Sequence, residues 1–176
     1  LWLGTLNGLV RYSGTKFKVY QYHPLDEKTI PPGEIKQILA TDKFKIWGLT
    51  SEGNMFLYDY MKPDDKEITR LNNVSGWPNF KIQLFHEVNT RMILIFDDLG
   101  KIWLLDKFTL SFQELKISAL RLKSKVYSAI TNTSGHYFGG KGEIYKISKK
   151  LDSLEIIRCP RNDVNAEDLS NFQIDF

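Results

Sequence analysis

A glycine-rich run near residue 140 has residue types that could bind a phosphate. Gly135 and the pair Gly140-Lys141 have the spacing of a phosphate-binding loop. Such a loop needs a Ser or Thr after the lysine and a helix whose first amide groups face the phosphate. Here the next residue is Gly142, and residues 143–147 alternate in polarity as a strand does. The run therefore predicts a hairpin turn and not a nucleotide site.

Three histidines and two acidic pairs are the other candidates for catalysis or metal binding. His23, His86 and His136 are far apart in the sequence and lack the spacing of metal ligands. The acidic pairs are Asp64-Asp65 and Asp97-Asp98, and neighbours in a strand point to opposite faces, so neither pair can offer two carboxylates to one substrate. We expect these acids in turns, and the sequence predicts no catalytic residue, no metal and no cofactor.

The composition is that of a globular chain. Its 176 residues are 42% hydrophobic and 26% charged, and 24 basic against 21 acidic residues give a net charge of +3. That excess is too small to indicate a nucleic-acid partner. A lone cysteine, Cys159, excludes an internal disulfide, and no apolar run is long enough to span a membrane, so no membrane contact is predicted.

A repeat decides the predicted fold. Gly8, Gly53, Gly100 and Gly142 recur at intervals of 45, 47 and 42 residues, each between two short runs of strand character. Two further alternating runs complete each unit, and Asn7-Gly8 is the strongest hairpin signal, typical of a type I′ turn. Four strands in about 45 residues is the period of a β-propeller blade.

The sequence is therefore predicted to be all-β, with about four blades of four antiparallel strands. The expected blade repeats run over residues 1–34, 35–79, 80–124 and 125–171, with residues 172–176 starting another blade. The first unit lacks its innermost strand. Part of a larger ring, of the seven-bladed type, is the favoured arrangement, and a closed four-blade ring is the alternative. Open end blades would leave apolar sheet faces available to neighbouring blades or to self-association.

The first unit carries a specific resemblance. The segment from Leu1 to Tyr12 reads LWLGTLNGLVRY, and Phe17-Lys18-Val19-Tyr20 follows it. This pattern resembles the two-component regulator propeller repeat, found in the extracytoplasmic sensor region of hybrid two-component histidine kinases. Later units keep less of it, such as Ile46-Trp47-Gly48 and Gly100-Lys101-Ile102-Trp103.

The resemblance implies a function. It suggests a periplasmic sensor segment that recognises an oligosaccharide and signals to a kinase outside this chain. The segment itself would not be an enzyme. The alternative is a non-catalytic propeller scaffold that docks another domain or protein. An enzyme of the propeller type would need a convergent acid and base, which the sequence does not offer.

The ligand face of such a propeller is formed by the connections between blades and by the turn between the second and third strands of each blade. The long connections make this face the expected site. Trp77, with neighbouring amides, could offer a sugar an apolar platform and hydrogen bonds, or it could pack between blades. The basic cluster of Lys116, Arg121, Lys123 and Lys125 could be a solvated loop or could face an anionic ligand. The predicted ligand-binding residues are Trp77, Asn72, Asn79, His23, Arg121 and Lys123.

Overall fold

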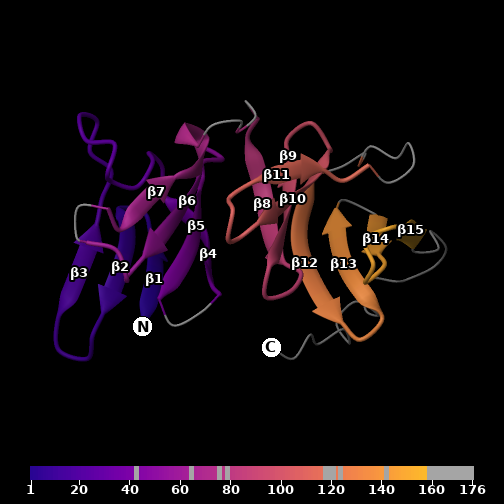
Figure 1. Cartoon of the computed structure of the whole chain (residues 1–176), viewed down its shortest axis with the longest axis horizontal. Coiled ribbons are helices and arrows are strands. Elements are labelled where there is room, and N and C mark those ends of the chain that lie inside the picture. The colour runs from indigo at the N-terminus through magenta and orange to yellow at the C-terminus, as the bar shows by residue number, and fades with distance from the viewer. Residues whose placement is uncertain are drawn as a thin grey trace, which may run out of the picture.

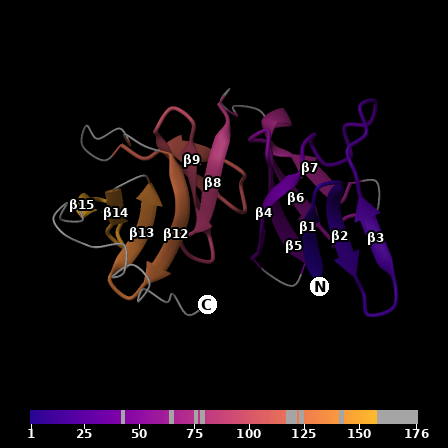
Figure 2. The ribbon, with the colours of Figure 1, turned by 180° about the vertical axis from the view of Figure 1, so that it is seen from behind.

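Four antiparallel sheets follow one another along the chain and stand side by side in chain order (Figures 1 and 2). The structure is a computed structural model that describes residues 1–41, 44–63, 66–74, 77, 80–116, 122, 125–140 and 143–157. In each sheet the strands are neighbours in chain order, as in a propeller blade.

The first sheet has three strands and the second has four. The first sheet contains β1 (Trp2–Thr5), β2 (Gly8–Tyr12) and β3 (Phe17–Tyr20). The second contains β4 (Ile35–Ala40), β5 (Lys45–Thr50), β6 (Met55–Asp59) and β7 (Ile68–Arg70), followed by the 3-10 turn η1 (Leu71–Asn73). The first sheet thus lacks an innermost strand among the described residues, as the sequence predicted.

The third and fourth sheets have four strands each. The third contains β8 (Ile82–Glu87), β9 (Met92–Asp97), β10 (Ile102–Asp106) and β11 (Phe112–Glu114). The fourth contains β12 (Val126–Asn132), β13 (Gly135–Gly140), β14 (Glu143–Ile147) and β15 (Leu154–Ile157). These strands coincide with the predicted runs, which confirms the all-β prediction. The strand expected at 172–176 lies outside the described residues.

The first hairpin differs from the prediction in its register. Thr5 pairs with Gly8, so the two loop residues are Leu6 and Asn7, and Gly8 already belongs to β2. The glycine is needed for another reason. It has a φ of 132°, and a Cβ there would lie 2.1 Å from the carbonyl oxygen of Tyr20 on β3. The prediction of a type I′ turn at Asn7-Gly8 is therefore wrong, because the close neighbouring strand and not the turn requires the glycine.

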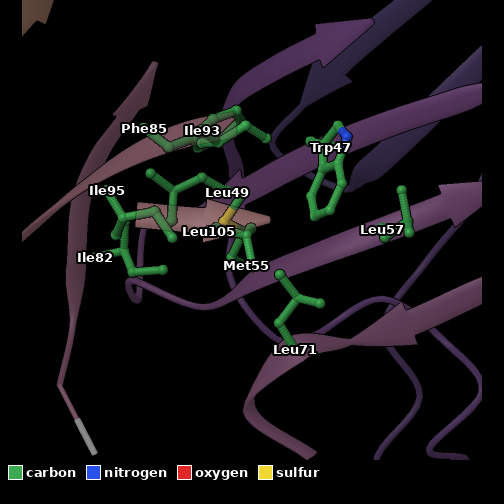
Figure 3. Packing of buried hydrophobic residues seen from close by; sticks show 10 residues of the cluster. All are labelled: Trp47, Leu49, Met55, Leu57, Leu71, Ile82, Phe85, Ile93, Ile95 and Leu105. Atoms are coloured by element: carbon green, nitrogen blue, oxygen red, sulfur yellow. The ribbon is translucent and has the colours of Figure 1, made fainter. Parts of the chain in front are cut away.

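The hydrophobic core lies between the sheets and not within one layer. One buried cluster fills each of the three gaps between consecutive sheets. Figure 3 shows the middle cluster, in which Trp47 and Leu49 of β5 meet Phe85 of β8 and Ile93 of β9. Tryptophans of the strands fill the space between sheets: Trp47 is fully buried there, and Trp2 packs against Tyr20 and Tyr58.

A buried polar chain also joins the first two sheets. The Tyr20 hydroxyl donates to the Tyr58 hydroxyl at 2.9 Å, and the Tyr58 hydroxyl donates to the Glu67 carboxylate at 3.1 Å. Lys18 completes the chain through an ion pair with the other Glu67 oxygen at 3.3 Å. Each buried polar group thus has a partner, which is the condition under which burying it costs little.

The two outermost sheet faces expose apolar side chains. On the first sheet these are Leu3, Phe17 and Val19, and on the fourth they are Ile130, Ile144 and Ile157. The corresponding inner faces are covered by the neighbouring sheet. Within the described part of the chain, no helix has the length and apolar character that crossing a bilayer requires.

Candidate ligand-binding site

Backbone hydrogen bonds tie the connections between sheets to the turns between second and third strands. The Ser51 amide donates to Glu34 at 2.8 Å, and the Asp98 amide donates to Lys81 at 2.9 Å. The Gly53 carbonyl then accepts from the amide of Ile82, the first residue of β8, and the Gly100 carbonyl accepts from the amide of Leu122 in the connection to β12, both at 3.1 Å. The two kinds of loop predicted to share one face are thus joined in the structure.

The innermost strands share an unexpected feature at this face. β4, β8 and β12 each carry a β-bulge one residue after the strand begins, at Lys36, Gln83 and Tyr127. A bulge inserts one residue and re-aims its side chain. The apolar residues on either side of each bulge can therefore both face the same inter-sheet gap, as buried Ile82 and Phe85 do.

The three bulge residues line one cavity with a volume of about 260 Å³. Its wall also includes Lys81, Lys125, Glu52 and Asp98. A second cavity of about 460 Å³ shares Glu52, Lys81 and Asp98 with the first and adds Phe80 and Leu99. We name these two adjoining cavities the bulge cavity; the first of them lies over the second, third and fourth sheets.

Hydrogen bonds between units involve the bulge residues of β4 and β8. Lys36 Nζ donates to the carbonyl oxygen of Gln83 at 2.9 Å, and Gln83 Oε1 accepts from the Val126 amide at 3.2 Å. On the neighbouring strand residue, Gln37 exchanges two hydrogen bonds with the backbone of Phe85. A ligand in the cavity would therefore meet groups whose positions depend on three sheets at once.

The cavity wall is polar and carries both signs of charge. The Lys81 amide donates to Asp98 Oδ1 at 3.2 Å, which orients that carboxylate. Among the described residues, the Glu52 carboxylate and the ammonium groups of Lys81 and Lys125 have no hydrogen-bond or ion-pair partner. Tyr127 adds a large apolar surface, since its side chain is 68% exposed. Such a mixture suits a hydroxylated ligand with an apolar face.

Trp77 packs into the core between the second and third sheets. Its ring lies 4.9 Å from Phe112 in an edge-on arrangement and 6.3 Å from Phe80, measured between centroids. It is half-buried against the cluster that contains Trp47. These are the contacts of the inter-blade alternative that the sequence left open, and a role of Trp77 in ligand binding stays a prediction.

The other predicted site residues are dispersed. His23 and Asn72 are exposed, and neither lines the bulge cavity. Their neighbours Lys28 and Asn73 line a separate hollow of about 410 Å³ beside β7. Asn79, Arg121 and Lys123 lie outside the described residues. Lys125 of the predicted basic cluster lines the bulge cavity.

Two histidines that are distant in the sequence meet between the third and fourth sheets. His86 Nε2 and His136 Nδ1 each lie 2.7 Å from the hydroxyl oxygen of Thr131. Burial lowers the pKa of both rings, helped at His86 by the charge of His136 and at His136 by that of Lys149, while Glu87 opposes the effect at His86. No cluster of three or more metal-ligating side chains occurs among the described residues.

This histidine pair predicts a pH-dependent stability. Folding lowers both pKa values from 6.5 and so favours the neutral rings. The stability that the neutral pair gives the fold is therefore fully present above pH 6.5 and is lost as the pH falls below it. We expect the thermal midpoint to fall between pH 7.5 and 5.5, and to fall less in a His86→Gln/His136→Gln variant. His23→Gln, at an exposed position, is the control. A midpoint of the parent chain that does not change over this range would contradict the prediction.

Comparison with known proteins supports the fold through structure alone. No protein-family profile and no curated protein sequence matches the chain. Several solved structures do match the chain. The extracellular domain of the hybrid two component system BT3049 from B. thetaiotaomicron has a TM-score of 0.68 at 17% identity, over 92% of this chain and 23% of that one.

Two further structures agree. The extracellular domain of the hybrid two component system BT4673 from B. thetaiotaomicron has a TM-score of 0.63 at 14% identity, over 94% of this chain and 21% of that one. The WD40 β-propeller domain of Doa1 has a TM-score of 0.56 at 16% identity, over 75% of this chain and 43% of that one. The chain thus spans about a quarter or less of the two-component domains, and its four sheets have the β-propeller fold.

Proposed function

We propose that the chain is the ligand-binding propeller segment of a two-component sensor, in the extracytoplasmic, periplasmic part of that protein. It binds an oligosaccharide and passes the signal to a histidine kinase outside this chain. The observation that carries this proposal is the bulge cavity. Three sheets place their bulge residues around one hollow on the loop face, and bulges often mark sites where a side chain is re-aimed for function.

The chemistry of the cavity favours binding over catalysis. Tyr127 offers a ring face to the C–H face of a sugar, while Gln83, Glu52 and Asp98 offer hydrogen-bonding groups to its hydroxyls. A sensor needs only differential affinity between two states to shift an equilibrium. Because Lys36 bonds to Gln83 and Gln83 bonds to Val126, next to the bulge of β12, ligand contacts there would favour one arrangement of the three sheets.

The second candidate function is a scaffold that docks neighbouring blades or another protein. The exposed apolar faces of the first and fourth sheets favour it, because every internal sheet face of the same kind is covered. These faces are also where self-association, or the further blades of a larger ring, would add. Both functions can belong to one protein.

Titration calorimetry against a panel of neutral and acidic oligosaccharides tests the proposal. We expect a saccharide of the panel to bind, and Tyr127→Ala to weaken its binding about three- to tenfold, as loss of one stacking contact does. Trp77→Ala is the matched control, because that ring packs in the core. Binding that survives in Tyr127→Ala and is lost in folded Trp77→Ala would move the site to the Trp77 loop. An absence of binding across the panel would favour the scaffold.

A further inference from the structure

Three lysines from different parts of the chain gather at the bulge cavity. Lys36 comes from β4, Lys81 precedes β8 and Lys125 precedes β12, and all three line the same hollow of about 260 Å³. Like charges brought together repel one another, so a cluster of this kind is stabilised by an anion. Two carboxylates, Glu52 and Asp98, share the wall and leave an excess of positive charge.

The ammonium groups have donors to spare. Lys36 Nζ uses one donor on the Gln83 carbonyl, and an ammonium group has three. Lys81 and Lys125 have no hydrogen-bond or ion-pair partner for theirs among the described residues. The Asp98 carboxylate accepts from the Lys81 backbone amide and forms no ion pair with the Lys81 ammonium group. Several N–H donors can therefore converge on one anionic group.

We propose that the ligand of the bulge cavity is an acidic saccharide, whose carboxylate or sulfate is bound by Lys36, Lys81 and Lys125. This rests on the proposed function and names the ligand class for the same site. The sugar ring lies against Tyr127, which is exposed beside the lysines. Glu52 and Asp98 accept hydrogen bonds from hydroxyl groups and disfavour a ligand that carries charge on every position.

The test compares each acidic saccharide with its neutral form. The probes are oligogalacturonate and its carboxyl-reduced counterpart, and a sulfated chondroitin oligosaccharide and its desulfated counterpart, titrated into the chain by calorimetry. We expect one acidic form to bind at least about tenfold more tightly than its counterpart. Lys81→Gln and Lys125→Gln should each raise the Kd roughly tenfold, the size of one charge-assisted hydrogen bond. The affinity should also fall with added salt.

Lys16→Gln is the control. Lys16 is exposed in the turn between β2 and β3, and its substitution changes the net charge by the same amount as Lys81→Gln or Lys125→Gln. Unchanged thermal midpoints would show that the lysine variants fold. Equal affinity for acidic and neutral forms, with Tyr127→Ala still weakening both, would overturn the acidic class and leave the proposed function standing. If Lys16→Gln lost as much affinity for the acidic saccharide as Lys81→Gln and Lys125→Gln, net charge alone would explain the loss, and the proposal would be overturned. No binding by any acidic form would overturn it as well.

Discussion

Gly100→Ala is expected to destabilise the chain by about 3 kcal/mol, against about 1 kcal/mol for Gly14→Ala. Both glycines have positive φ, 78° and 98°, so both substitutions force an L-residue into a left-handed conformation. Only Gly100 adds a steric conflict. A Cβ there would lie 2.5 Å from the carbonyl oxygen of Leu122, whereas nothing lies within 4 Å of a Cβ at Gly14.

The difference in unfolding free energy between Gly100→Ala and Gly14→Ala measures the contact of the Gly100 turn with Leu122. Leu122 donates its amide to the Gly100 carbonyl and buries its side chain in the cluster between the third and fourth sheets. A Cβ at Gly100 therefore pushes the connection out of the core. Urea unfolding of both variants gives the comparison, with equal m-values as the check on two-state behaviour. Equal losses of stability would mean that Leu122 does not pack against the turn.

Trp47→Ala is expected to cost about 3–5 kcal/mol, the range for a large buried aromatic side chain. Trp47 is fully buried, and its Nε1 donates to the Thr41 hydroxyl at 3.1 Å. The substitution leaves a cavity between the second and third sheets that Leu39 and Leu57 cannot fill without moving.

Trp77→Ala, in the same cluster, is the comparison for the stability lost in Trp47→Ala. Its ring is half-buried, so we expect about 2 kcal/mol, together with a loosened contact to Phe112. The free energy of unfolding of both variants is measured in urea. A Trp77→Ala variant as stable as the parent would show that this ring is available to a ligand, which would contradict the packing described above.

Local signals sufficed to predict the strands and most turns. Period-two alternation bounded by Gly, Asp and Pro depends on residues that are close in the sequence, so the strand runs could be recognised one by one. Asp59 and Asp106 stabilise the turns that follow β6 and β10, since their carboxylates accept from the backbone amides of Met61 and of Phe108 and Thr109. The repeat then supplied the order of the sheets.

Features that depend on how the units pack could not be predicted in this way. His86 and His136 looked unrelated because their contact requires two sheets to stack in register. The sequence does contain a sign of the bulges. Ile82 and Phe85 are three residues apart, whereas apolar side chains on one face of a regular strand are two apart. Residues of three sheets form the bulge cavity. Residues predicted from one loop at a time, such as His23 and Asn72, do not line it.

Amide hydrogen exchange, with and without the tightest-binding saccharide of the panel, tests the central claim most directly. The account predicts that ligand slows exchange around residues 35–37, 81–83 and 125–127, three segments that meet at the bulge cavity. Slower exchange in residues 23–30 and 71–74, with these three segments unchanged, would contradict it and place the ligand beside β7.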